Sequence, residues 1–304
     1  MPFISSIGQE HPQNYLSNLP VAKLIAPKSD SSCLTQLNFN KNLILLDPNS
    51  TNHVKHLSVP ELQYTVSKQL PHDTNAYTEG LVFQADYLYE STGIVGFSRL
   101  NKINSNNGLI VAQGLTPKNI FAEGLTILND NLYQFSYKKN IVNIYPIKNL
   151  EKLSQIHYDK DAWGVAAIDK QHLLVSDGSS QLHWFDPNKQ TIVKSAQVHY
   201  QKYLVQGLNE LEMINGKILA NIWPTQCIAV INSDRLEVEA WINLSQLNDL
   251  NRDENSYATT NGIAYDEVRH ELIVTGKFWQ SFYFLKFSQP DSFMNATNNK
   301  NREK

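Results

Sequence analysis

Residues 121–137 of the chain read FAEGLTILNDNLYQFSY, and this stretch indicates how the whole chain folds. It opens with a small turn that carries Glu123, continues as an alternating apolar run, and reaches Asn129-Asp130-Asn131 before a second alternating run. Alternation places one face of each strand in a core, and Asn and Asp tolerate the backbone angles of tight turns. The stretch therefore predicts a strand, a hairpin turn and a second strand.

The same pattern occurs four more times along the chain. The other copies are YTEGLVFQADYLYE at 77–90, AWGVAAIDKQHLLVSD at 162–177, LNELEMINGKILANIW at 208–223 and TNGIAYDEVRHELIVTGK at 260–277. One aligned position is occupied by Glu79, Glu123, Trp163, Asn209 and Asn261, at steps of 44, 40, 46 and 52 residues. A strand-rich repeat of about 40 to 50 residues is typical of propellers with one four-stranded blade per repeat. We therefore predict an all-β fold, a five-bladed β-propeller.

The aligned position has a functional consequence. Equivalent positions of successive blades converge on the central axis of a propeller, so these five side chains should form a ring at one mouth of the channel. A structural ring would be small or apolar, whereas this one holds two carboxylates, two amides and an indole. Polar groups gathered in a narrow channel indicate a binding or catalytic site.

A second set of side chains stands at the end of the second strand of the repeats. Tyr137, Asp177 and Trp223 each follow the ring residue of their own repeat by 14 positions, and Lys277 follows Asn261 by 16. Asp177 lies in Ser-Asp-Gly and is most simply a turn residue that bonds nearby backbone amides. Lys277 is either an ion-pair partner of the ring carboxylates or a group that polarises a substrate carbonyl, and spacing alone leaves both open.

Composition narrows the functional classes. The chain has 304 residues, 26 of them basic and 29 acidic, without a basic run that would indicate a nucleic-acid groove. No apolar run approaches the length of a membrane span, and the N-terminus has no recognisable secretory signal, so the compartment stays open. Cys33 and Cys227 lie far apart without metal-ligand spacing. We expect two free thiols, with a disulfide between them as the alternative.

We expect three parts in the chain. Residues 1–60 do not fit the repeat and form an N-terminal extension that packs on the propeller or stays partly loose. Residues 61–288 form the propeller, and residues 289–304 a disordered tail. The last blade lacks one strand, and 62–70 is the natural donor that closes the ring. A closed ring has no sheet edge that demands a partner, so we expect a monomer.

A set of motifs carries a family resemblance. In chain order they include PHDTNAYTEGL, LYESTG, FAEGLT, LYQFSY, AWGVA, LNELE, NIWPTQCIAVI, TNGIAYD and VTGKFW. Over about residues 65–288 the ordered set resembles the glutaminyl cyclases, or glutaminyl-peptide cyclotransferases, of the plant and bacterial type. The resemblance implies a five-bladed propeller that converts the N-terminal glutamine of peptides or proteins to pyroglutamate and releases ammonia. It implies no required cofactor, and a structural cation stays open.

The resemblance also implies roles for three catalytic residues. Glu123 would bind the α-amine of the substrate, take its proton as general base and return that proton to the leaving nitrogen. Lys277 would stabilise the negative charge that develops on the γ-carbonyl oxygen. Asn209 would orient the side-chain amide of the substrate glutamine.

Four further residues are expected to bind the substrate. By the resemblance, Trp163, Trp223 and Tyr137 would enclose the glutamine side chain and hold it folded for attack. Glu79 would contact the amine or set the charge state of Glu123. Many members of the family have Trp where this chain has Tyr137, and we expect altered substrate preference from that difference.

Two other functions stay open from the sequence. A metal-dependent hydrolase of the lactonase kind would hold a central ion with Glu79, Glu123, Asn209 and Asn261. Against it, the indole of the ring and Lys277 suit an uncharged amide better than a cation. A propeller that binds peptides without catalysis is the other alternative, because a fold does not determine a function.

Overall fold

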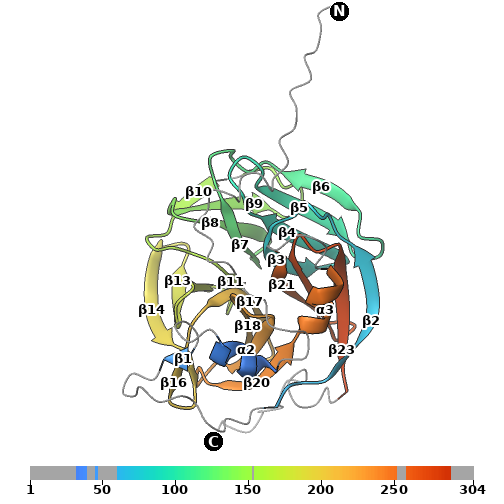
Figure 1. Ribbon diagram of the computed structural model, residues 1–304. Helices are drawn as coiled ribbons and strands as arrows, with labels where there is room; N and C mark the ends of the chain where they lie inside the picture. Colours follow the sequence, from blue (N-terminus) through green and yellow to red (C-terminus); the bar gives the residue numbers. More distant parts are fainter. Residues whose placement is uncertain (1–31, 40–44, 47–59, 153, 252–257, 289–304) are drawn as a thin grey trace, which may run out of the picture.

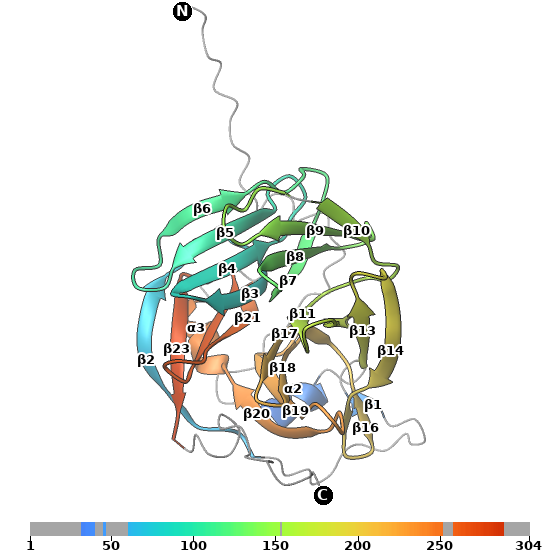
Figure 2. The same cartoon turned by 180° about the vertical axis from the view of Figure 1, so that it is seen from behind.

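The structure, a computed structural model, describes residues 32–39, 45–46, 60–152, 154–251 and 258–288. Within these residues, five four-stranded antiparallel sheets are arranged around one axis, as Figures 1 and 2 show. The predicted all-β, five-bladed β-propeller is confirmed.

The first three blades each use four strands that follow one another in the chain. Blade 1 consists of β3 to β6, at Thr78–Gln84, Tyr87–Thr92, Arg99–Asn104 and Ile110–Gly114. Blade 2 consists of β7 to β10, at Ala122–Leu128, Asn131–Ser136, Ile141–Pro146 and Ser154–His157. Blade 3 consists of β11 to β14, at Val165–Ala167, Leu173–Ser176, Gln181–Asp186 and Thr191–Gln197.

The last two blades complete and close the ring. Blade 4 consists of β17 to β20, at Leu208–Ile214, Lys217–Ile222, Cys227–Asn232 and Val238–Asn243. Blade 5 consists of β21, β22 and β23, at Thr259–Asp266, Glu271–Lys277 and Ser281–Phe287, with β2, at Tyr64–Pro71, as its outer strand. The strand predicted as donor at 62–70 therefore closes the propeller from the N-terminal side, paired antiparallel with β23.

Local sequence explains the hairpins of the repeat. The two residues of the turn between β7 and β8, Asn129 and Asp130, both have positive φ, as do Asn215 and Gly216 between β17 and β18. Turns of this geometry favour Asn, Asp and Gly and match the twist of antiparallel strands. The apolar faces of the strands then pack between neighbouring blades, and Leu125 of blade 2 contributes to one such buried cluster with residues of blade 1.

The N-terminal segment is attached to blade 4, where one expectation from the sequence was wrong. Helix α2, at Cys33–Phe39, buries Cys33 and Leu37 in a cluster shared by blades 3 and 4. Cys33 and Cys227 form a disulfide with a Cα–Cα distance of 5.8 Å, instead of two free thiols. Their separation of 194 residues gave no signal in the sequence, because it is the docking of α2 that brings the two side chains together.

A small sheet and a second helix complete the described elements. β1, at Leu45–Leu46, pairs with β16, at Tyr203–Val205, which also pairs with β15, at His199–Tyr200. Helix α3, at Ser245–Asn251, follows blade 4. The predicted tail at 289–304 and most of the predicted extension at 1–60 lie outside the described residues, so the three-part division of the chain stays a prediction.

Candidate active site

The predicted ring residues stand at irregularities of the innermost strands. The pairing register between the first two strands shifts at Glu79 in blade 1, at Glu123 in blade 2, at Asn209 in blade 4 and at Asn261 in blade 5. Trp163 of blade 3 stands just before its inner strand. A bulge re-aims a side chain and is frequent beside active sites. The inner strands β3, β7, β11, β17 and β21 contact one another around the axis, which brings these positions together.

A buried ion pair lies at the junction of blades 5 and 1. Nζ of Lys277, at the end of β22, lies 2.6 Å from Oε1 of Glu79, and the two residues are 4% and 2% exposed. Nδ2 of Asn261 donates to the other oxygen of Glu79 at 3.2 Å. Of the two readings of Lys277, the structure thus shows an ion pair with a ring carboxylate. Burial lowers the pKa of Lys277, but its neighbours, Glu79 foremost, together outweigh burial and raise this pKa overall, so the ammonium stays charged.

The second ring carboxyl, Glu123, lies beside this pair and has a raised pKa. Glu123 is 6% exposed and shares a hydrogen bond with Glu79. Burial, followed by the charge of Glu79, raises the pKa of Glu123 well above its usual range. Burial also raises the pKa of Glu79, but there the bonded Lys277 offsets part of the rise. Of the two carboxyls, Glu123 therefore holds a proton more readily than Glu79, which Lys277 helps to keep ionised.

Aromatic rings surround the charged group. The ring centroid of Tyr77 lies 4.2 Å from Nζ of Lys277, a cation–π contact. Tyr77 packs edge-on against Phe121 at 6.0 Å and Phe278 at 5.2 Å, and Phe121 packs against Tyr137 at 6.0 Å. Tyr137, which we expected to line the site, is therefore connected to Lys277 by a chain of ring contacts through Phe121 and Tyr77. These rings limit the access of water to the ion pair.

The two predicted tryptophans meet on the other side of the ring. Trp163 and Trp223 pack edge to face, with centroids 5.8 Å apart and an interplanar angle of 83°, and both are half-buried. Gly178, with φ +79°, makes this possible, because a Cβ there would lie 2.7 Å from the indole of Trp163. The pair forms an apolar wall that is partly open to solvent.

The remaining two predicted positions differ from each other. Oδ1 of Asn209 is buried and has no hydrogen-bond partner among the described residues, which suits a group that waits for a ligand. Asp177 makes contacts with residues close to it in the chain. Its carboxylate accepts from the backbone N–H of Ser179 at 3.0 Å and lies 3.0 Å from Nε2 of His183. These contacts agree with the turn role expected for Asp177.

Comparison with known proteins identifies the family of the chain. Residues 41–287 match the protein family described as "Glutamine cyclotransferase". The chain belongs to the glutamine cyclotransferase family. It is 36% identical over 228 residues to a glutaminyl-peptide cyclotransferase of Arabidopsis thaliana, which covers 74% of this chain and 71% of that protein. The crystal structure of Myxococcus xanthus glutaminyl cyclase superposes with a TM-score of 0.69 at 27% identity, covering 76% of this chain and 98% of that one.

Sequence reasoning missed part of the site in this member of the glutamine cyclotransferase family. Tyr77 and Phe121, which connect the charged group to Tyr137, were not singled out. A signal was present, because each stands two residues before the ring carboxylate of its own repeat, Glu79 or Glu123. An aromatic residue repeated at one position of two adjacent blades must lie at the same level of the channel.

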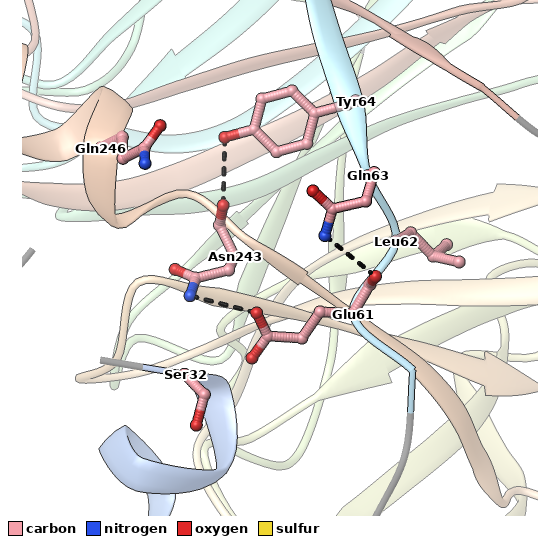
Figure 3. Close-up of a pocket in the computed structure, with 7 residues that line it drawn as sticks. All are labelled: Ser32, Glu61, Leu62, Gln63, Tyr64, Asn243 and Gln246. Carbon is pink, nitrogen blue, oxygen red and sulfur yellow. Dashed lines mark hydrogen bonds between the residues drawn. The ribbon is translucent and has the colours of Figure 1, made fainter. Parts of the chain in front are cut away.

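A cavity formed by described residues lies apart from the ring. The cavity, of about 400 Å³, lies between α2, β2 and α3, and none of its lining residues belongs to the ring (Figure 3): Ser32, Glu61, Leu62, Gln63, Tyr64, Asn243 and Gln246. Within the described part of the chain, no group of three or more His, Cys, Asp or Glu side chains could hold a metal ion. The same residues include no helix long and apolar enough to cross a membrane.

Proposed function

We propose that this member of the glutamine cyclotransferase family converts the N-terminal glutamine of peptides or proteins to pyroglutamate. The observation that carries the proposal is the buried group of Glu79, Glu123 and Lys277 on blades 1, 2 and 5. Blades 3 and 4 supply the tryptophan pair. Such a site offers a proton carrier, a fixed positive charge and an apolar surface together. Cyclisation of a glutamine side chain needs all three.

The proton carrier is Glu123. In the reaction the α-amine nitrogen bonds to the side-chain amide carbon, the bond from that carbon to the amide nitrogen breaks, and ammonia leaves. One proton passes from the attacking amine to the leaving nitrogen. A carboxyl whose pKa is raised toward the working pH can both accept and donate it, so Glu123 ends the cycle as it began. A bound α-ammonium favours the ionised form of Glu123, whose own proton passes to solvent. The carboxylate then takes a proton from the ammonium, which frees the amine to attack, and gives that proton to the leaving nitrogen. The second proton of the ammonium passes to the departing ammonia.

Lys277 and Asn209 act on the amide that is attacked. An ammonium has three donors, so Lys277 can retain Glu79 while it donates to the γ-carbonyl oxygen as negative charge develops there. Asn209 would orient the side-chain amide of the substrate by accepting a hydrogen bond at its Oδ1, which has no partner among the described residues. Together with burial, the negative charge of Glu79 would favour the protonated form of Glu123.

The tryptophan wall and Tyr137 supply the fit. Trp163 and Trp223 would hold the methylene chain of glutamine in the folded form in which its amine reaches its own amide carbon. We propose that no metal takes part, that the protein acts as a monomer, and that nucleic acid is not a partner. Tyr137 would shift the preference among substrates without preventing turnover.

The first experiment is turnover of a short peptide with N-terminal glutamine, followed by mass spectrometry with and without a chelator. Loss of one ammonia in both samples is the expected result. The same peptide with an acetylated N-terminus is the control, because its amine cannot attack. Loss of ammonia only without the chelator would favour the metal-dependent alternative, and no loss in either would favour a propeller that only binds peptides.

A further inference from the structure

One residue beside the ring breaks the repeat. The position that follows the ring residue is glycine in four blades, namely Gly80, Gly124, Gly164 and Gly262. In blade 4 the same position is Glu210, the central residue of LNELE. The proposed reaction gives this glutamate no role.

Three of these glycines, those of blades 1 to 3, mark a layer in which the backbones of neighbouring inner strands approach closely. A Cβ on Gly124 would lie 2.7 Å from the backbone N of Val165, and one on Gly164 would lie 2.1 Å from the backbone O of Asn209. Real Cβ atoms do not make such contacts, so this layer excludes side chains on those strands. Glu210 therefore occupies space near the axis that the other blades leave to backbone.

The contacts of Glu210 cross from blade 4 to two other blades. Its Oε1 accepts a hydrogen bond from the backbone N–H of Leu81 on β3 at 3.2 Å, and its Oε2 accepts one from the backbone N–H of Ile263 on β21 at 2.8 Å. Glu210 is 0% exposed. Both carboxylate oxygens are thus used on backbone groups of strands other than its own, which satisfies two buried donors near the axis.

These contacts end next to the proposed site. Leu81 follows Glu79 by two residues, and Ile263 follows Asn261 by two residues on the inner strand of blade 5. Glu210 itself directly follows Asn209. One side chain therefore connects the three strands that carry Glu79, Asn261 and Asn209.

We propose that Glu210 is a positioning residue that holds strands β3, β17 and β21 at the spacing the proposed active site requires. It acts through the backbone and does not touch the substrate. A misplacement of catalytic groups by about 1 Å can cost about 100-fold in rate, so the strut is expected to matter for turnover more than for binding. Burial, followed by the charge of Glu212, raises the pKa of Glu210 well above its usual range.

The test rests on the proposed cyclase activity and compares three variants. Glu210→Gln keeps the size but replaces one acceptor oxygen with a donor, Glu210→Ala removes both acceptors, and Glu210→Gly restores the residue of the other four blades. The control is Glu271→Gln with Glu271→Ala. Glu271 is also buried, accepts from Oγ of Ser67 at 2.6 Å, and stands at the opposite end of the strand that ends in Lys277.

Turnover is measured well below the melting temperature of every variant. We expect kcat to fall about tenfold for Glu210→Gln and about 100-fold for Glu210→Ala and Glu210→Gly, with KM changed less than threefold. The Glu271 pair should stay within about twofold of the wild type. Equal kcat in wild type and Glu210→Ala would overturn the proposal.

A second measurement does not depend on catalysis. The backbone amide resonances of Leu81 and Ile263 should shift in Glu210→Ala, and those of Glu79 and Asn261 should shift with them, while the Glu271 variants leave all four in place. Unchanged Glu79 and Asn261 resonances would refute the strut even if the wild type had no cyclase activity. If the wild type had no turnover but Glu210→Ala still shifted these resonances, the proposed function would be refuted and the positioning role of Glu210 would be retained.

Discussion

The two sides of the proposed site are built differently. Blades 5, 1 and 2 supply a charged side, in which Lys277, Glu79, Glu123 and Asn261 are buried and bonded to one another. Blades 3 and 4 supply an aromatic side, whose two indoles contact each other and remain half-exposed. The charged side is organised by its own contacts before any ligand arrives, whereas the aromatic side keeps a face open.

The aromatic side is supported from outside the ring. Trp223 begins the segment that leads to Cys227, the partner of Cys33 in the disulfide. Between them, the side-chain oxygen of Gln226 accepts from the backbone N–H of Thr260 at 3.1 Å. The backbone N–H of Gln226 donates to the side-chain oxygen of Gln36 on α2 at 2.9 Å. We infer that the charged side determines the chemistry and the aromatic side determines the fit. Each prediction below separates the two.

The largest effect is expected for Glu123→Gln. The variant keeps the size of the side chain but cannot carry the proton, so kcat should fall at least about 1,000-fold while the fold is retained. Single-turnover kinetics with circular dichroism would measure both. Glu271→Gln, which replaces a buried carboxyl away from the ring, is the control. Retention of the wild-type rate by Glu123→Gln would show that another group moves the proton.

The next effect is expected for Lys277→Met, which removes the ammonium and keeps most of the side-chain volume. Loss of the oxyanion partner should lower kcat about 100-fold to 1,000-fold and change KM far less. Lys217→Met is matched to it, because Lys217 is also ion-paired, with Glu239, but lies outside the ring. If Lys277→Met raised KM and left kcat intact, the lysine would be a substrate anchor.

The difference between the two sides also explains what the sequence could predict. The repeat predicted both the fold and the ring positions. Glu79, Glu123 and Asn209 occupy equivalent places in it, and a strand-rich repeat of this length is typical of a propeller. Turn chemistry at Asn129-Asp130 located the hairpins by the same local rule. What depends on one blade alone was not predictable in this way.

Three features show this limit. The raised pKa of Glu123 follows from burial and from the charge of a side chain on another blade, which no spacing encodes. The disulfide to Cys33 depends on where a segment outside the repeat docks. Glu210 gave no signal, because aligned repeats point to residues that recur, whereas Glu210 replaces a glycine that recurs in the other four blades.

Removal of the disulfide should affect stability and leave the chemistry in place. In the double variant Cys33→Ala with Cys227→Ala, loss of a crosslink across 194 residues should lower the free energy of unfolding by about 2–4 kcal/mol. Because α2 contacts the segment after Trp223 and not the ion pair, kcat at low temperature should stay within about threefold. Urea unfolding and kinetics of the same samples measure both. A large fall in kcat would mean that the charged side also depends on α2.

A smaller effect, on binding, is expected for Trp223→Leu. Loss of one wall of the aromatic side should raise KM about tenfold, about 1.4 kcal/mol, with a weaker effect on kcat. Trp184→Leu is the control, because Trp184 is also half-buried in blade 3 but contacts Lys194 and lies on β13 away from the ring. An equal rise in KM for both variants would attribute the effect to general loosening.

The last effect leaves the kinetics aside and concerns stability and pH, and it tests the raised pKa of Glu123 without any substrate. The pKa of Glu123 is raised in the folded protein, so the unfolded chain loses this proton first and stability falls as pH rises above about 4.3. Glu123→Gln cannot titrate. It should therefore become more stable than the wild type as pH rises from about 4.3 toward the raised pKa, by about 1.4 kcal/mol for each unit of the shift.

A second buried glutamate should behave in the opposite way. Burial raises the pKa of Glu90, but the charge of His72 and hydrogen bonds from His72, Asn101 and Thr78 lower it overall. Its ionised form therefore stabilises the fold above about pH 4.3, and that contribution is lost as pH falls through the lowered pKa. Glu90→Gln should thus be less stable than the wild type at pH 7, with a difference that shrinks in acid. Urea unfolding from about pH 2 to 8 would show Glu90→Gln losing stability relative to the wild type up to about pH 4.3 and Glu123→Gln gaining it above that pH. A Glu123→Gln curve parallel to that of the wild type above about pH 4.3 would mean that the pKa of Glu123 is not raised.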